Sequence, residues 1–294
     1  MASGNGILEQ VQHMGRSNAH CPTTIAIAGG KGGIGKSAIA VNLSAALAGS
    51  HRRVLLIDGD FALANADLLL GLTPKYTLRD VLDGARSLDE AISVCNFGFS
   101  VLAGASGISR LATLGESEIL GLVRAFSSLK SVPDTVVIDT AAGLSPAVTR
   151  LSHAAQEILV VICDEPASLA DAYAYIKVMR RNHGVRRFHI IANMARGDGE
   201  GGRVFAMLKR VTDRFLDVSL RYTCEIPDDP YMRRAIRNQQ PVVIAHPGSP
   251  SARALKYLAK LASAWSPPAE TRGTIEFFAE RLIARPTARL ELVG

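Results

Sequence analysis

The sequence has few aromatic residues and no long hydrophobic run. Phe, Trp and Tyr make up only 5% of its 294 residues, so Leu, Ile, Val and Ala must fill any core. No apolar stretch approaches the roughly 20 residues that a membrane-spanning helix needs. Residues 1–22 contain no hydrophobic segment of the signal-peptide kind. These absences predict a cytoplasmic protein without a transmembrane helix.

Cysteine is also scarce, and its four residues are far apart: Cys21, Cys95, Cys163 and Cys224. None of them forms a C-x-x-C pair, and the histidines are scattered, so the sequence gives no support for a metal site built from these residue types. The last three cysteines lie in apolar surroundings. We expect them to pack as small hydrophobic residues.

Acidic residues are slightly outnumbered by basic ones. The chain has 33 Lys and Arg residues against 27 Asp and Glu residues, a formal charge of +6. This balance suits an anionic partner such as a nucleotide, a nucleic acid or a lipid surface. The basic residues are spread along the chain, and the densest group is Arg233, Arg234 and Arg237. Direct DNA binding stays a minority alternative, and specific DNA binding is not expected.

Short apolar segments alternate with helical patterns along most of the chain. We expect strands at residues 23–28, 53–57, 99–103, 135–138, 157–163, 187–192 and 220–226. We expect helices at 37–48, 78–82, 88–92, 116–129, from an N-cap at Ser168 to 183, from 203 to 216, at 230–238 and at 251–265, with 199–202 as a flexible loop. The strands are nearly all apolar, which indicates burial on both faces. The pattern predicts an α/β fold, a doubly wound and mostly parallel sheet with helices on both faces.

The chain divides into three parts on this interpretation. A polar segment, 1–22, precedes the main domain, 23–265, and the break Ser266-Pro267-Pro268 separates that domain from a tail, 266–294. On a helix, Phe278 and Leu282 would lie in one apolar arc with Glu276 and Glu280 outside it. This tail could pack on its own domain, contact a membrane weakly or bind a partner.

One glycine-rich stretch, residues 25–37, carries the clearest chemistry. Gly30, Gly35, Lys36 and Ser37 satisfy the phosphate-loop pattern of a glycine, four residues and Gly-Lys-Ser. Backbone N–H groups of such a loop converge on phosphate oxygens at a helix N-terminus. Lys36 would supply charge to the outer phosphates and Ser37 a hydroxyl to Mg²⁺. The alternative, a glycine-rich turn that binds nothing, fits less well because the loop follows a predicted strand and precedes a predicted helix.

Carboxylates stand where two other strands end, which is where open α/β sheets bind ligands. Asp139 follows an apolar strand and suits Mg²⁺ binding, directly or through water; its alternative is a helix N-cap. Asp58 and Asp60 both end another strand. One would orient Mg²⁺-bound waters and the other would position the attacking water, unless both are turn residues. Gly143 would let a backbone N–H approach the γ-phosphate.

Lys31 gives the loop a second lysine, as Lys31-Gly-Gly-Ile-Gly-Lys-Ser37. It could be a solvated charge or a cation aimed at phosphates. This form resembles the deviant Walker A box of the MinD/ParA ATPases. The segments 58–67 and 139–143 resemble that family's two switch segments. Gly59 departs from the family pattern, in which alanine or another small side chain is more common, and we expect it to loosen the first switch slightly.

Later segments resemble the flagellar-number regulators of the FleN or FlhG type. They are Leu70-Gly-Leu-Thr-Pro74, Cys163-Asp-Glu-Pro166, Asp171-Ala-Tyr173, residues 211–217 and residues 272–282. The likeness runs from about residue 23 to about residue 285. Generic MinD or ParA proteins would share the loop but not these strings. A loose likeness of residues 9–14 to an element with which such regulators stimulate a GTPase is a weaker hypothesis.

The resemblance implies an ATPase that forms a homodimer when ATP is bound. Lys31 would cross to the partner's nucleotide, Lys36 would hold phosphate, and Asp60 would assist water attack. The implied ATP contacts are Gly30, Lys31, Gly32, Gly33, Ile34, Gly35, Lys36, Ser37, Ala38, Gly143, Asn193, Pro227 and Asp228, the last three near adenine. The implied Mg²⁺ ligands, direct or through water, are Ser37, Asp58 and Asp139.

The resemblance also implies partners and a role. These regulators restrain a flagellar transcription activator, FleQ, and oppose the GTPase FlhF, which would place this chain in the cytoplasm or at the membrane near the cell pole. A MinD-like positioning ATPase and a ParA-like partition protein that binds nucleic acid are the alternatives. A metabolic phosphate-loop enzyme is disfavoured because the sequence contains no separate substrate-binding constellation.

Overall fold

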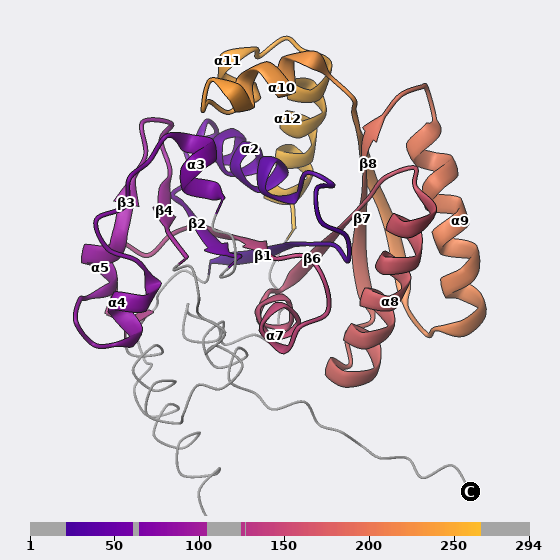
Figure 1. Cartoon of the computed structure of the whole chain (residues 1–294), viewed down its shortest axis with the longest axis horizontal. Coiled ribbons are helices and arrows are strands. Elements are labelled where there is room, and N and C mark those ends of the chain that lie inside the picture. Colours follow the sequence, from indigo (N-terminus) through magenta and orange to yellow (C-terminus); the bar gives the residue numbers. More distant parts are fainter. Residues whose placement is uncertain (1–21, 61–64, 105–124, 127, 266–294) are drawn as a thin grey trace, which may run out of the picture.

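An eight-stranded sheet forms the centre of the molecule (Figure 1). The computed structural model describes residues 22–60, 65–104, 125–126 and 128–265. The strands lie in the order β3-β4-β2-β5-β1-β6-β7-β8, and every neighbouring pair is parallel except β3 with β4. The predicted doubly wound, mostly parallel sheet is therefore confirmed.

Seven of the strands agree with the predicted apolar segments, but β3 was missed, because residue 92 was assigned to the helix that in the structure ends at Ala91. The bounds of the strands are β1 (Thr23–Ala28), β2 (Val54–Gly59), β3 (Ile92–Val94), β4 (Ser100–Leu102), β5 (Thr135–Thr140), β6 (Glu157–Ile162), β7 (Arg187–Ala195) and β8 (Ser219–Pro227). Within β1, Ile25 and Ile27 contact one hydrophobic cluster while Ala26 and Ala28 contact the clusters of the opposite face. Burial on both faces explains why these strands read as continuous apolar runs.

Helices cover both faces of the sheet. They are α2 (Lys36–Ala48), α3 (Ala66–Leu70), α4 (Leu78–Leu82), α5 (Leu88–Ala91), α7 (Pro146–Ala154), α8 (Pro166–His183), α9 (Glu200–Phe215), α10 (Pro230–Arg237), α11 (Val242–Ala245) and α12 (Pro250–Ser263). In Figure 1, α2, α3 and α10–α12 lie on one side of the strands, and α7 and α8 on the other. No helix in the described part of the chain is long and apolar enough to cross a membrane.

Two predictions about helix starts were wrong. Ser168 does not begin a helix: α8 starts at Pro166, and the Ser168 hydroxyl accepts the N–H of Cys163 at 3.1 Å. Residues 199–202 are not a loop throughout, because α9 starts at Glu200. A Cβ on Gly201 would stand 2.8 Å from the Cβ of Ala192. Glycine at that position therefore serves close packing of α9 on β7, not flexibility.

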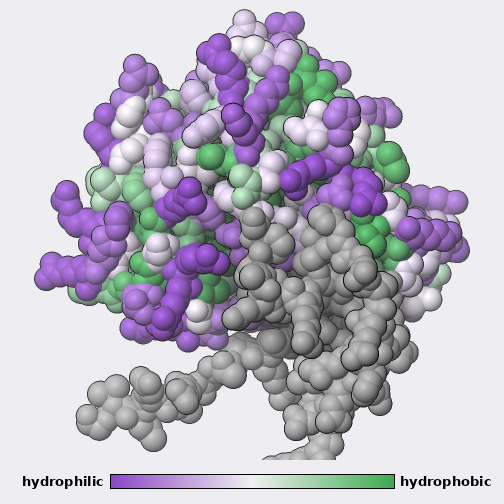
Figure 2. Space-filling view, turned by 180° about the vertical axis from the view of Figure 1, so that it is seen from behind, coloured by the Kyte–Doolittle hydropathy of each residue, from purple (hydrophilic) through white to green (hydrophobic). Residues whose placement is uncertain are grey.

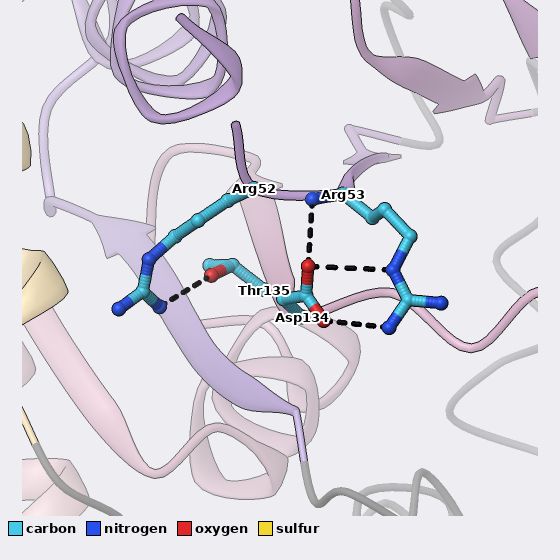
Figure 3. A network of polar contacts seen from close by, with 4 residues as sticks. All are labelled: Arg52, Arg53, Asp134 and Thr135. Atoms are coloured by element: carbon cyan, nitrogen blue, oxygen red, sulfur yellow. Dashed lines mark hydrogen bonds and ion pairs between the residues drawn. The ribbon is translucent and has the colours of Figure 1, made fainter. Parts of the chain in front are cut away.

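A network of polar contacts lies at the amino ends of β2 and β5 (Figure 3). The predicted ligand residues lie at the other, carboxyl ends of these strands. The Arg53 backbone N–H and guanidinium donate to both carboxylate oxygens of Asp134, at 2.7 to 3.3 Å. Arg52 donates to the Thr135 hydroxyl at 3.5 Å and to the Ser263 carbonyl at 2.9 Å. These bonds tie the start of β2 to the start of β5 and to the end of α12.

Several predictions fall outside the described residues. These are the segment 1–21, the tail 266–294 and most of the helix predicted at 116–129. The cysteine prediction is confirmed where it can be examined, because Cys95, Cys163 and Cys224 are buried free thiols.

Candidate nucleotide-binding site

The phosphate loop connects β1 to α2 and is tightly held. Gly33 and Gly35 have φ values of 77° and 88°, in the left-handed region that favours glycine. A Cβ on Gly30 would stand 2.5 Å from the Cβ of Asp171, and one on Gly35 would stand 2.4 Å from Nδ2 of Asn193. The glycines are therefore needed both for backbone conformation and for close approach of α8 and β7. Gly32 is exposed, Ile34 is buried and Ala38 is half-buried.

Lys36 opens α2 and lies almost entirely inside the protein. Its side chain belongs to a residue only 7% exposed, and its Nζ donates to the Lys31 carbonyl at 3.1 Å. Burial lowers the pKa of Lys36, while the charges of Asp139 and Asp60 act in the opposite direction. An ammonium group has three donors. The single bond to the Lys31 carbonyl leaves donor capacity for a phosphate group.

Asp139 lies in β5 beside this lysine and is fully buried. Neither of its carboxylate oxygens has a hydrogen-bond partner with good geometry, and the Ser37 hydroxyl is near enough only to lower the pKa of Asp139. Burial is the main cause that raises the pKa of Asp139 to about 7; the Ser37 hydroxyl and Lys36 oppose the rise, and the charge of Asp58 contributes to it. Asp139 is not a helix N-cap, because Ser145 caps α7 and accepts the N–H of Val148. A buried carboxylate without partners is the chemistry that a hydrated cation satisfies.

Asp58 holds the chain that follows β2. Its carboxylate accepts the backbone N–H groups of Asp60, Asn65 and Ala66, each at 3.0 Å. Burial raises the pKa of Asp58 to about 6, although these three bonds lower it. These three hydrogen bonds agree with the alternative prediction that Asp58 is a turn residue. The Mg²⁺ role of Asp58 stays a prediction.

Asp60 is half-buried at the end of the same strand. Its charge raises the pKa of both Lys36 and Asp139, which places it close to the phosphate loop. Gly59 lies between the two aspartates, and its expected loosening of the first switch stays a prediction, because residues 61–64 are outside the described part of the chain. It lies inside β2, and a Cβ there would stand 2.8 Å from the Asp139 carbonyl oxygen. The absence of a side chain at residue 59 lets β2 and β5 align their carboxylates.

Lys31 forms an ion pair with Glu165, the residue that precedes α8. The hydrogen bond to Glu165 raises the pKa of Lys31. The two side chains are 33% and 53% exposed, so the pair lies at the surface. Sequence reasoning missed Glu165. It lies in a string used for the family resemblance, but no local pattern gives it a role because its partner is 134 residues away.

The residues expected near adenine fall into two groups. Asn193 supports the phosphate loop, since its Nδ2 donates to the Ile34 carbonyl at 2.8 Å. Asp228 instead bonds with its own neighbourhood: its N–H donates to the Ala195 carbonyl at 2.8 Å and its carboxylate pairs with Arg233. Pro227 ends β8 next to it. Gly143 has a φ of 97°, and a Cβ there would meet no atom within 4 Å.

The structure thus brings Lys36, Ser37, Asp58, Asp60 and Asp139 together at the carboxyl ends of β1, β2 and β5. Asn193 joins them through the loop. The described residues contain no group of three or more His, Cys, Asp or Glu side chains able to hold a metal ion.

Comparison with known proteins agrees with this geometry. The family profile described as "CobQ/CobB/MinD/ParA nucleotide binding domain" matches residues 25–242. The chain is 46% identical over 267 residues to the antiactivator FleN of Pseudomonas aeruginosa, covering 91% of this chain and 95% of FleN. It is 30% identical over 217 residues to the flagellum site-determining protein YlxH of Helicobacter pylori, covering 74% and 73% of the two chains.

A solved structure shows the same fold. The septum site-determining protein MinD of Pyrococcus horikoshii, complexed with Mg-ADP, superposes with a TM-score of 0.67 at 30% identity, over 83% of this chain and 96% of MinD. The sequence-level resemblance is therefore confirmed. The chain belongs to the CobQ/CobB/MinD/ParA family of nucleotide-binding proteins and is an ATPase of the MinD/ParA type, similar over nearly its whole length to FleN.

Proposed function

We propose that this chain is an ATP-hydrolysing dimerisation switch that restrains a flagellar transcription activator. The observation that carries the proposal is the different environment of the two loop lysines. Lys36 is buried beside Asp139, where a nucleotide's own phosphates would lie, whereas Lys31 is at the surface and paired with Glu165. A surface lysine in a phosphate loop is suited to a second nucleotide rather than its own.

The buried residues fit MgATP. Lys36 would meet the outer phosphates with its remaining N–H donors, and the loop N–H groups between Gly30 and Ser37 would meet the others. Ser37 and Asp139 would hold Mg²⁺, Asp139 directly or through water. The ion or its water would then give a partner to the carboxylate oxygens of Asp139, which have none in the structure. When bound, the ion offsets the negative charge that builds on the phosphates during transfer.

Asp60 is the group that we assign to the attacking water. It lies at the end of β2, near both Lys36 and Asp139, and is partly exposed. Asp58, fully buried and bonded to three N–H groups, is fixed in place and so positions the segment that carries Asp60. This division of labour gives each aspartate a separate task.

Dimerisation would require Lys31 to exchange partners. In the isolated chain its ammonium is neutralised by Glu165; in a face-to-face dimer it would leave that carboxylate for the partner's phosphates. Solvent screens an exposed ion pair and weakens it. Nucleotide phosphates can displace it easily. Slow turnover would then keep the dimer long enough for a partner to respond to it.

The regulatory role rests on similarity to an antiactivator over 91% of the chain. We propose a FleQ-like activator as the restrained partner and an FlhF-like GTPase as the opposing one. The test measures the ATPase rate of the purified activator with this chain present, in ATP, in ADP and without nucleotide. We expect inhibition that depends on ATP. An activator whose rate is the same in all three conditions would contradict the proposal.

A further inference from the structure

The positive charge of the molecule is concentrated in one region. Residues 177–221, which run from α8 through β7 and α9 into β8, contain 11 Lys and Arg residues and four Asp and Glu residues, a net charge of +7. The whole chain carries +6, so the rest of it is close to neutral. The basic character that suggested an anionic partner therefore belongs to the edge of the molecule built by α8 and α9, on the right in Figure 1.

Helix α9 exposes apolar side chains on this edge. Met207, Val211 and Phe215 are 43%, 44% and 61% exposed and lie one helical turn apart, so they form a continuous row. The core-facing side of the same helix is occupied by Val204, Leu208 and Thr212. Figure 2 views the molecule from behind, where the α8–α9 edge lies on the left and shows long hydrophilic side chains around apolar patches.

Two arginines run beside this row. Arg210 and Arg214 are exposed, and their positions on the helix place them next to Met207 and Val211. We call Met207, Arg210, Val211, Arg214 and Phe215 the α9 ridge. The Arg214 guanidinium lies 5.2 Å from the centroid of the Phe215 ring. Cationic and apolar groups thus share one surface.

The acidic groups nearby are already paired elsewhere. Lys209 binds Asp213 at 2.7 Å, and Asp217 accepts a hydrogen bond from Arg180 at 3.2 Å and forms an ion pair with Arg186 at 3.6 Å. Neither Arg210 nor Arg214 forms an ion pair with any residue that the structure describes. The ridge therefore presents uncompensated positive charge together with exposed hydrophobic surface.

The residue types indicate a protein partner. Nine of the 11 basic residues in 177–221 are arginine. Arginine, methionine and phenylalanine are enriched at protein interfaces, where lysine is depleted. Nonspecific nucleic-acid binding rests on phosphate contacts and does not call for an exposed Met-Val-Phe row. The charge complement of the ridge is a segment with carboxylates beside apolar side chains.

We infer that the α9 ridge docks an acidic, amphipathic helical segment of a partner protein. Apolar anchors of that segment would cover Met207, Val211 and Phe215, and its carboxylates would pair with Arg210 and Arg214. The choice of the first partner to test, a FleQ-like activator, rests on the proposed function. The surface itself is independent of the nucleotide site.

The experiment uses the full chain and two ridge variants. One reverses charge, Arg210→Glu with Arg214→Glu, and the other removes anchors, Met207→Ser with Phe215→Ser. A matched control changes the same chemistry on α12, where Tyr257 is 53% exposed between the exposed Lys256 and Lys260: Tyr257→Ser with Lys260→Glu. Thermal melting and ATP turnover establish that each variant is folded. We expect affinity for the activator to fall about tenfold or more in both ridge variants and to stay unchanged in the control.

The outcomes of this experiment distinguish the α9 ridge inference from the proposed function. Equal binding of the activator by wild type and ridge variants overturns the ridge inference and leaves the proposed function intact. If wild type does not bind the activator, the proposed function fails, and a synthetic helical peptide with leucines one turn apart and flanking glutamates tests the ridge alone. Saturable binding that the ridge variants weaken about tenfold supports the inference.

Three results with that peptide panel would overturn it. The first is no binding of the acidic peptide by wild type, or binding that the ridge variants do not weaken. The second is ridge-dependent binding of phosphatidylglycerol vesicles or of duplex DNA in place of the peptide. The third is preferential binding of a peptide of residues 272–285, which would assign the ridge to the chain's own tail.

Discussion

Replacing Asp139 by asparagine should stabilise the nucleotide-free protein at alkaline pH. The carboxylate is fully buried and has no hydrogen-bond partner, and its pKa is raised from 3.8 to about 7. As the pH rises, the unfolded chain loses this proton first, so folding stability is lost between about pH 4 and about pH 7. Below that range Asp139 is neutral and resembles asparagine.

The expected change in the free energy of unfolding follows from the raised pKa of Asp139. About three pKa units at 1.36 kcal/mol each correspond to roughly 4 kcal/mol. Asp58 titrates in the same range and is electrostatically coupled to Asp139, so only part of this belongs to one residue. We expect Asp139→Asn to raise the free energy of unfolding by roughly 2 kcal/mol at about pH 8 and by almost nothing at about pH 4.

Urea unfolding of the wild type and the variant, without nucleotide and with a chelator, measures this difference. Asp134→Asn is the control, because that carboxylate is bonded to Arg53 and its loss should destabilise the protein by about 1 kcal/mol. Adding MgATP should reverse the order, since wild type would gain the ion that Asp139 holds and the variant would not. If Asp139→Asn were no more stable than wild type at alkaline pH, our account of the buried carboxylate would be refuted.

Three further changes test other parts of the site. Gly59→Ala should destabilise the chain by about 1–3 kcal/mol, because its Cβ would stand 2.8 Å from the Asp139 carbonyl, whereas Gly248→Ala has free space; thermal melting compares them. Glu165→Gln should release Lys31 and lower the ATP concentration needed for dimerisation, measured by sedimentation; an unchanged or higher requirement would show that the pair does not oppose the dimer. Asp60→Ala should bind ATP normally but hydrolyse it at least about tenfold more slowly in single-turnover assays, and an unchanged rate would move its role elsewhere.

The sheet and the location of the site were predictable because both depend on short-range sequence features. Apolar runs buried on two faces gave the strands, and parallel strands place their carboxyl ends at one edge. The glycine spacing around Lys36 gave the loop. The glycine at residue 30 was predictable from the phosphate-loop pattern. The physical reason for it, close contact with Asp171, appears only in the folded structure.

The remaining features depend on contacts between distant segments. A serine after a proline reads as an N-cap, yet Ser168 is needed by the N–H of Cys163. A glycine cluster reads as a loop, yet Gly201 is fixed by packing on β7. The Lys31–Glu165 pair and the bonds of Asp58 to the chain after β2 arise only when the fold brings those groups together. The positive charge of residues 177–221 can be counted from the sequence, but only the fold shows that these residues form one edge of the molecule.

The most direct test of the proposed switch is the mass of the protein in solution with and without ATP. Size-exclusion chromatography with light scattering would be run on wild type, Lys31→Ala and Lys36→Ala, with nucleotide binding measured in parallel. The account predicts that wild type is a monomer with ADP and a dimer with ATP. Lys31→Ala should bind ATP and stay monomeric, and Lys36→Ala should lose tight ATP binding. A wild type that stays monomeric in ATP, or a Lys31→Ala variant that dimerises normally, would contradict it.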